Sequence, residues 1–185
     1  MTRPGTGLGD LRHEIARFDR SVDALFDRLR GRPLVDRVLY TASDLGDLSL
    51  LWLVLAAARG LRSDRDLRAA LRLAASAGVE SVLVNGAIKS LFRRDRPFDD
   101  LERPHYLRQP RTSSFPSGHA TSAFSALVVL GEDDVLAPLY GVLAAVVAVS
   151  RIHVKIHHAS DVVAGALLGL TFGAAVRRLF PLGPR

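Results

Sequence analysis

The sequence predicts an all-α protein: an integral-membrane helical bundle of about five transmembrane helices, preceded by an N-terminal amphipathic helix. From Val38 onward, long apolar segments alternate with short polar ones, and few polar residues interrupt the apolar segments. Ionisable groups inside membrane spans are rare, so this sparseness favours a membrane bundle over a soluble one. Apolar and polar residues do not alternate with a period of two, so we expect no strands.

Length and composition indicate one domain with a short arm, which we place at residues 1–37, before a membrane-embedded domain at residues 38–185. A hydrophobic content of 48% excludes disorder for most of the chain. The absence of cysteine excludes disulfides, thiolate metal sites and a cysteine nucleophile. The net charge of +6 raises nucleic acid or an anionic membrane as a partner. The basic residues are mostly arginines beside alanine- and leucine-rich runs, a pattern that coding bias also produces, so the charge alone identifies neither partner.

The first predicted helix spans residues 8–30 and carries a narrow apolar stripe at steps of three and four residues. The stripe consists of Leu11, Ile15, Phe18, Val22, Leu25 and Leu29. Gly31 and Pro33 end this helix. Packing on its own domain is the first interpretation of the stripe, and lying on a membrane surface or forming a short coiled-coil contact are the alternatives.

Five apolar segments follow: Val38–Ala58, Ala69–Ile88, His119–Gly131, Val135–Ser150 and Ala159–Val176. A membrane span needs about 20 mostly apolar residues, and no segment is both that long and free of charge. Hydropathy alone therefore leaves a buried soluble bundle open. The first segment carries Asp44 and Asp47 on one helical face, for which we expect a structural ion pair or a water-lined face, with pairing to active-site arginines as the alternative.

Residues 89–118, between the second and third segments, are rich in Arg, Pro, Asp and Ser. A loop of this length in a compact domain is typically functional or disordered, and its charge favours a functional one. Four of its arginines are expected to meet lipid phosphates rather than substrate: Arg93, Arg94, Arg103 and Arg108.

Three polar clusters flank the apolar segments, and antiparallel crossing of successive helices would bring them to one end of the bundle. The clusters are Lys89 to Arg96 after the second segment, Pro116 to His119 before the third, and Ser150 to Asp161 between the fourth and fifth. Three of their residues are fixed cations that complement the charge of a phosphoryl group in its transition state: Lys89, Arg96 and Arg151.

The same clusters supply the other parts of a phosphoryl-transfer site. Ser117 and the backbone N–H groups of Gly118 and His119 would lie at a helix N-terminus, which binds anions. Two histidines suit a double displacement, in which one attacks phosphorus and the other protonates the leaving oxygen. Asp161 lies four residues after His157, so on a helix it can orient that imidazole.

These clusters carry three motifs: K-x6-R-P at Lys89–Pro97, P-S-G-H at Pro116–His119 and S-R-x5-H-x3-D at Ser150–Asp161. In order and internal spacing the chain resembles the type 2 phosphatidic acid phosphatase family, which also includes vanadium haloperoxidases. The resemblance implies an all-helical core and hydrolysis of a lipid phosphomonoester or diphosphate, without metal or other cofactor, through a phosphohistidine intermediate. It implies His157 as nucleophile, His119 as general acid and Asp161 as the residue that orients His157. The implied phosphate-binding residues are Lys89, Arg96, Ser117, Gly118 and Arg151.

The third motif departs from the family's common pattern around its fixed residues. Lys155 stands where members often carry Gly, and His158 and Ala159 replace a common Tyr-Pro. Lys155 and His158 are therefore candidate contacts to the substrate headgroup. A surface lysine that reaches solvent is the alternative for Lys155.

Two further functions stay open beside a membrane lipid phosphatase. One is a vanadate-dependent haloperoxidase-like enzyme, against which the apolar segments count. The other is a non-catalytic basic helical protein that binds membranes or nucleic acid, which leaves the motif spacing unexplained. We expect a lipid phosphate as substrate and membrane lipids as partners, and we expect no nucleic acid partner; a homo-oligomer stays open.

The arginines give an expectation for the side of the membrane that the site faces. With five spans, the arm and the motif loops lie on one face of a multi-pass protein of the cell membrane. Short basic segments next to a membrane span tend to stay in the cytoplasm. The arginines of the arm are nearly balanced in number by those on the opposite face. The remaining arginines of residues 89–111 then lean the site toward the cytoplasm.

Overall fold

A computed structural model describes residues 7–97 and 112–183, and the regular elements in these two ranges are all helical. The α-helices are α1 (Gly7–Asp27), α2 (Pro33–Leu45), α3 (Leu50–Gly60), α4 (Asp64–Ser81), α5 (Lys89–Leu91), α6 (Gly118–Leu130), α7 (Ala137–His153) and α8 (Ala159–Leu179). A 3₁₀ turn (Asp47–Ser49) joins α2 to α3, and a π-helical segment (Val82–Ile88) joins α4 to α5. The predicted all-α class is confirmed.

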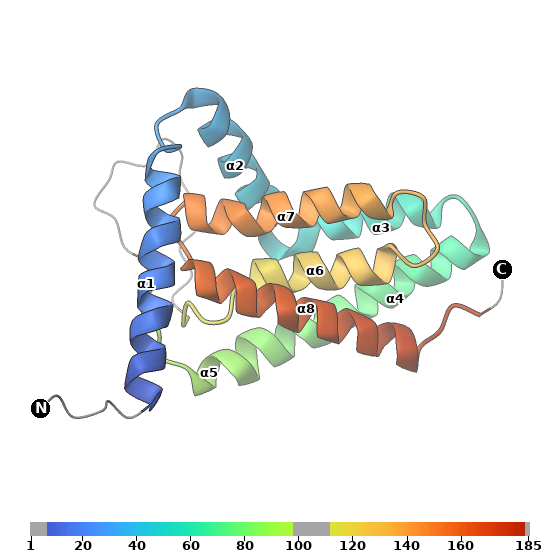
Figure 1. The fold of residues 1–185 in the computed structure, drawn as a ribbon. Helices are drawn as coiled ribbons and strands as arrows, with labels where there is room; N and C mark the ends of the chain where they lie inside the picture. Colours follow the sequence, from blue (N-terminus) through green and yellow to red (C-terminus); the bar gives the residue numbers. More distant parts are fainter. Residues whose placement is uncertain (1–6, 98–111, 184–185) are drawn as a thin grey trace, which may run out of the picture.

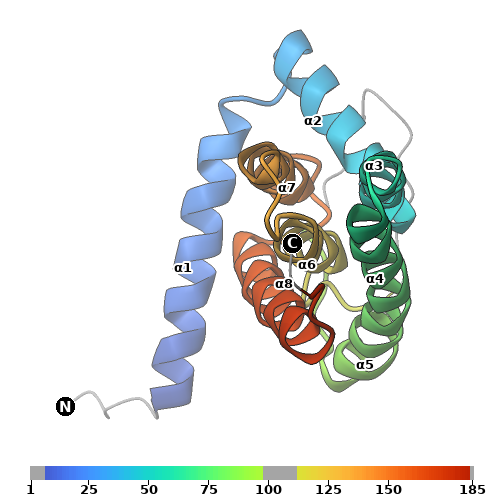
Figure 2. The same ribbon diagram turned by 90° about the vertical axis from the view of Figure 1, so that its right-hand side faces the viewer.

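Helix α6 lies in the middle of the bundle, with α7, α8, α3 and α4 around it (Figure 2). Helix α1 runs across one end of the bundle rather than along it (Figure 1). At that end lie α5, the start of α6, the end of α7 and the start of α8 (Figure 1). We call it the motif end, defined by Lys89, Ser117, Arg151 and His157. The predicted meeting of the three motifs at one end of the bundle is what the structure has.

The first apolar segment, predicted as one helix, is two helices bent by 72° relative to each other. The break occupies residues 46–49, where Ser49 has a left-handed φ of 58°, a conformation that a continuing helix excludes. Gly46 has no side chain, and a Cβ built on it would lie 2.9 Å from His119 Cδ2. The break therefore brings the backbone between α2 and α3 against one of the predicted catalytic histidines.

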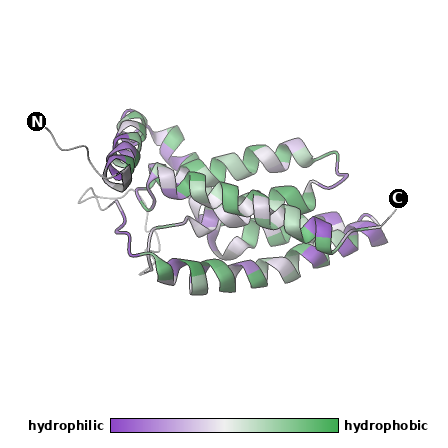
Figure 3. Ribbon diagram, turned by 60° about the horizontal axis from the view of Figure 1, so that its bottom comes forward, coloured by the Kyte–Doolittle hydropathy of each residue, from purple (hydrophilic) through white to green (hydrophobic). Residues whose placement is uncertain are grey.

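Length and composition single out few of these helices as membrane spans. Among the described residues, α8 alone is long and apolar enough to cross a bilayer, and the bent α2–α3 pair qualifies if it counts as one span. Helix α6 has 13 residues and would be about 20 Å long, less than the ~30 Å hydrocarbon core. Apolar residues dominate the middle of the bundle, and polar ones gather on α1 and at the opposite end (Figure 3). The count of five spans stays a prediction.

Helices α6 and α8 pack more closely than any other pair because α8 presents glycines to α6. A Cβ built on Gly165 would lie 2.4 Å from the carbonyl oxygen of Ser117, and one on Gly169 would lie 2.2 Å from that of Thr121. One helical turn later, a Cβ on Gly173 would lie 2.8 Å from Val128 Cβ. Side chains at these positions would push the helices apart, so the glycines fix the separation of the two helix starts at the motif end.

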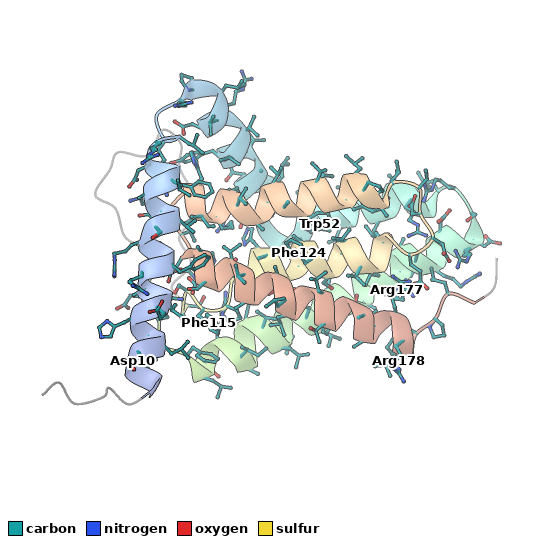
Figure 4. The ribbon with its side chains drawn as sticks, in the orientation of Figure 1. Asp10, Trp52, Phe115, Phe124, Arg177 and Arg178 are labelled. Carbon is teal, nitrogen blue, oxygen red and sulfur yellow. The ribbon has the colours of Figure 1, made fainter. Side chains whose placement is uncertain are left out.

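The core beside this helix pair is made of aromatic and aliphatic side chains, with Trp52 and Phe124 between the helices (Figure 4). Ion pairs close the bundle at the end away from the motifs. Arg59, whose side chain is 1% exposed, donates to Asp66 Oδ1 at 2.7 Å, and Arg72 pairs with Glu132. Arg177 of α8 approaches the same Glu132 carboxylate at 3.4 Å. These ion pairs hold together the end of the bundle that carries none of the three motifs.

Helix α1 packs on its own domain through part of the predicted apolar stripe and through Phe26, which lies outside it. Val22 and Phe26 contact the core cluster at the start of α8, and Asp19 is buried beside them. Other stripe residues stay open: Leu11, Phe18 and Leu25 are 55%, 46% and 57% exposed. Packing on the domain is thus confirmed for part of the stripe. Helix α2 begins at Pro33, inside the segment assigned to the arm.

Candidate active site

A cavity of about 550 Å³ opens at the motif end, lined by residues from all three motifs. Its lining includes Lys89, Gly118, His119 and His157. Lys89 reaches the second motif, since a Cβ built on Gly118 would lie 3.6 Å from Lys89 Nζ. Arg96 Nη1 lies 3.4 Å from His157 Nε2. Residues of all three motifs therefore meet at one cavity, although Arg96, Arg151 and Asp161 are not among its lining residues.

The π-helical segment explains how the second apolar segment delivers Lys89. A π turn inserts an extra residue and changes the direction in which the following side chains point, and such turns are common at functional sites. Here it places Asn85 as well as Lys89 beside Gly118: Asn85 Oδ1 would be 3.3 Å from a Cβ built there. Sequence reasoning missed Asn85, because nothing in residues 82–88 distinguishes a π turn from an α turn.

Ser117 caps the start of α6 from a buried position. Its side chain accepts a hydrogen bond from the N–H of Ala120, and its own N–H donates to the carbonyl oxygen of Asp161 at 3.0 Å. The first turn of α6, with Gly118 and His119, thereby opens on the cavity and directs its N–H groups there. Ser117 itself is buried and is not among the residues that line the cavity, so its direct contact with phosphate stays a prediction.

His157 is buried in the turn between α7 and α8, with its two ring nitrogens in different surroundings. Nε2 faces Arg96, and Nδ1 lies 3.7 Å from Asp161 Oδ2, an electrostatic contact longer than a hydrogen bond. Burial, with the charges of Arg151 and Arg96, lowers the pKa of His157 to about 3, against the opposing influence of Asp161. The imidazole is therefore neutral at physiological pH, and a nucleophilic lone pair is available.

His119 has an acidic partner that the sequence did not assign to it. His119 Nε2 lies 2.9 Å from Asp47 Oδ1, which comes from the break between α2 and α3. We expected a structural ion pair for Asp47, and the structure gives it a predicted catalytic histidine instead. Asp44 is exposed and does not line the cavity. The carboxylate of Asp47 favours the protonated imidazole, the form that a general acid needs, whereas burial and the charges of Arg151 and Lys89 oppose it.

The two remaining cations are held by contacts within the chain. Arg151, 2% exposed, donates to the hydroxyl of Ser43 on α2. Arg96 donates to three backbone carbonyl oxygens, those of Thr112, Ser113 and Ile156, at 3.1, 3.2 and 3.0 Å. Burial lowers the pKa of Arg96 from its ordinary value, and the residue remains charged. Both guanidinium groups are thus fixed before any phosphate arrives.

The two candidate headgroup contacts lie apart from the cavity lining. Lys155, at a left-handed φ of 51°, places Nζ 3.3 Å from Asp23 and 3.6 Å from Asp27, both on α1. His158 is the N-cap residue of α8, and its ring nitrogen Nε2 lies 3.3 Å from the carbonyl oxygen of Asp95. Their role at the headgroup stays a prediction.

Arg94 does not behave as predicted. It was expected to meet lipid phosphates, yet it pairs with Asp161 at 2.5 Å and with Asp19 at 2.6 Å. Arg103 and Arg108 lie outside the described residues. Within the two described ranges, histidine and carboxylate side chains form no group of three or more that could hold a metal ion.

Comparisons with known proteins agree on one family. A family model described as the PAP2 superfamily matches residues 69–183. A decaprenylphosphoryl-5-phosphoribose phosphatase of Mycobacterium tuberculosis is 39% identical over 148 residues, which cover 77% of this chain and 82% of that protein. A putative undecaprenyl-diphosphatase of Escherichia coli is 30% identical over 154 residues, or 80% of this chain and 76% of that protein.

Two solved structures are similar to this one over most of its length. The transmembrane PAP2-type phosphatidylglycerolphosphate phosphatase of Bacillus subtilis has a TM-score of 0.64 at 25% identity, covering 90% of this chain and 88% of that one. Aquifex aeolicus LpxE has a TM-score of 0.63 at 25% identity, covering 85% and 93%. Most of this chain thus has a structural counterpart in a transmembrane phosphatase.

Proposed function

Since this chain belongs to the PAP2 superfamily, we propose that it removes a phosphate from a polyprenyl-linked lipid through a phosphohistidine intermediate. The relatives and the similar solved structure are phosphatases of lipid phosphates. This similarity favours a membrane lipid phosphatase over the haloperoxidase and the non-catalytic alternatives. The observation that carries the proposal is the cavity at the motif end, in which Lys89, His119 and His157 meet.

The proposed reaction has two displacements at phosphorus. In the first, His157 Nε2 attacks phosphorus, the bond from phosphorus to the lipid oxygen breaks, and His119 donates a proton to that oxygen. In the second, His119 takes a proton from water, whose oxygen attacks phosphorus as the P–N bond breaks. Inorganic phosphate leaves, and His157 is neutral again. Lys89, Arg96 and Arg151 neutralise the charge that the phosphoryl oxygens carry throughout.

A polyprenyl-linked substrate is the narrower part of the proposal. It is supported by the two curated relatives, whose names specify a decaprenylphosphoryl sugar phosphate and an undecaprenyl diphosphate. Phosphate release by detergent-solubilised protein should be compared for these two lipids, phosphatidic acid and phosphatidylglycerophosphate. We expect the highest kcat/KM with a polyprenyl-linked substrate. Equal or higher kcat/KM with the glycerolipids would contradict the assignment.

Chelation of divalent metal is expected to leave turnover unchanged. In the proposed reaction three cationic side chains neutralise charge, of which Lys89 lines the cavity and Arg96 lies 3.4 Å from His157, and the described residues offer no cluster of metal ligands. Phosphate release should be measured after dialysis against EDTA, and orthovanadate should inhibit because it adopts the five-coordinate geometry of the transition state. Loss of activity on chelation, with recovery on adding magnesium, would show that the chemistry needs a metal.

We propose that the motif end faces the cytoplasm, and the lack of native cysteine makes the orientation measurable. Glu14 on α1, 63% exposed, lies at the motif end, and Leu61, 89% exposed, lies at the opposite end. In intact cells a membrane-impermeant maleimide should label Leu61→Cys, and should label Glu14→Cys only after permeabilisation. The reverse pattern would place the active site outside the cytoplasm.

A further inference from the structure

We propose that Arg94 and Asp19 form a positioning pair, through which helix α1 fixes the orientation of Asp161 and so of the His157 imidazole. The inference rests on the proposed function, in which His157 is the nucleophile. It assigns a role in catalysis to a residue of the N-terminal helix. It also assigns a role to an arginine between the two fixed positions of the first motif.

The carboxylate of Asp161 is fully buried, and its two oxygens have separate partners. Oδ2 accepts the N–H of His158 at 2.9 Å and faces His157 Nδ1 at 3.7 Å. Oδ1 accepts from Arg94 Nη1 at 2.5 Å. Rotation of the carboxylate would move Oδ2 away from the imidazole, and the bond from Arg94 to Oδ1 opposes that rotation.

Arg94 is in turn held from α1. Its Nη2 donates to Asp19 Oδ2 at 2.6 Å, while Nη1 also donates to Ser160 Oγ at 2.8 Å. The planar guanidinium therefore bridges two carboxylates, one on α1 and one on α8, at a fixed angle. Lysine has the same charge but no rigid fork, so it could satisfy only part of this geometry.

Asp19 closes the network by capping α8 from another helix. Its Oδ1 accepts the backbone N–H of Ser160 at 2.8 Å, and its Oδ2 accepts the Ser160 hydroxyl at 2.9 Å. The residue is 7% exposed, although Phe18 next to it in the sequence is 46% exposed. A buried carboxylate is costly unless its charge is compensated, and here both oxygens are directed to the start of the helix that carries Asp161.

Simple attachment of α1 to the bundle does not require this arrangement. After the end of α1, Arg30 donates to the carbonyl oxygens of Ile152 and His153 at 2.9 and 2.8 Å. Asp23 accepts from Arg30 at 2.7 Å and pairs with Lys155. These contacts hold α1 against the end of α7. The Asp19 contacts are distinguished by their direct connection to Asp161.

A double-mutant cycle tests the inference with the most active lipid of the substrate comparison. We expect Arg94→Ala and Asp19→Asn each to lower kcat about tenfold, a modest loss for misplacement of a catalytic group by a fraction of an ångström, with KM little changed. In an Asp161→Asn background the same changes should lower kcat less than about twofold, because the orientation they secure no longer matters. Arg94→Lys should retain less activity than the wild type but more than Arg94→Ala.

Matched controls separate positioning from folding. Asp23→Asn loosens α1 four residues away without a contact to Asp161, and should leave kcat within about twofold of the wild type. Equal losses from Arg94→Ala in both backgrounds, or no loss in the wild-type background, would overturn the inference. If Arg94→Ala does not fold, the isosteric Asp19→Asn carries the cycle alone. The proposed function fails separately, if His157→Ala still turns over.

Discussion

Replacing His157 with alanine is expected to abolish phosphate release, by a factor of about 10³ or more in kcat. The covalent intermediate needs Nε2, which lies 3.4 Å from Arg96 Nη1. Binding should survive, because the cations and the start of α6 remain. Turnover and vanadate binding of the variant, measured side by side, check both expectations.

The intermediate itself can be trapped. Phosphohistidine is hydrolysed in acid, whereas phosphoserine is stable there, so the reaction with a phosphate-labelled substrate should be quenched under mild alkaline conditions. The wild-type chain should then retain label, and His157→Ala should carry none. His119→Ala should slow substrates with a poor alcohol leaving group far more than activated ones, because protonation matters less for a good leaving group. Label that persists in His157→Ala would assign the nucleophile to another residue.

Replacing Gly169 with leucine is expected to disrupt the contact between α6 and α8. Even a Cβ would lie 2.2 Å from the carbonyl oxygen of Thr121, and that oxygen belongs to a backbone that cannot rotate away. Overpacking of this kind costs about 1–3 kcal/mol or more, so we expect a fall in Tm and a loss of activity together. Thermal unfolding in detergent and phosphate release measure the two effects.

Gly141 provides the matched control in α7. A Cβ built there would meet only Leu127 Cδ1 at 3.8 Å, an ordinary contact. Gly141→Ala should therefore keep activity and raise stability by up to about 1 kcal/mol, because alanine favours a helix over glycine. A Gly169→Leu protein with unchanged Tm would mean that the helices separate without cost, contrary to the packing described.

The order and length of the apolar segments predicted both the helices and the meeting of the three motifs. Apolar segments of this length cross a layer alternately up and down, so Lys89, the start of α6 and the turn with His157 must share an end. That inference needs only the order of the segments. It does not need side-chain positions, which is why it held although the first segment proved to be two helices.

Contacts that depend on exact backbone path could not be predicted in this way. The pairing of Asp47 with His119 depends on a helix break at residues 46–49, within an otherwise continuous apolar segment. The π turn that directs Asn85 leaves no trace in composition. Arg94 resembled its basic neighbours in the sequence, and only the approach of α1 and α8 distinguishes it. Long-range polar contacts of this kind are set by packing.

The glycines of α8 recur at every fourth residue, so the surface they form is nearly identical after each turn. A slide of α8 along α6 by about 6 Å would place Gly169 where Gly165 had been and restore a similar close contact. Gly165 and Gly169 therefore fix the distance between the helices but do not by themselves fix the register. The register depends on polar bonds at the motif end, above all from the N–H of Ser117 to the carbonyl oxygen of Asp161. A chain that slipped by one turn would bring Arg177 to the place of Gly173 beside Val128, and His157 and His119 would no longer meet across the same phosphate.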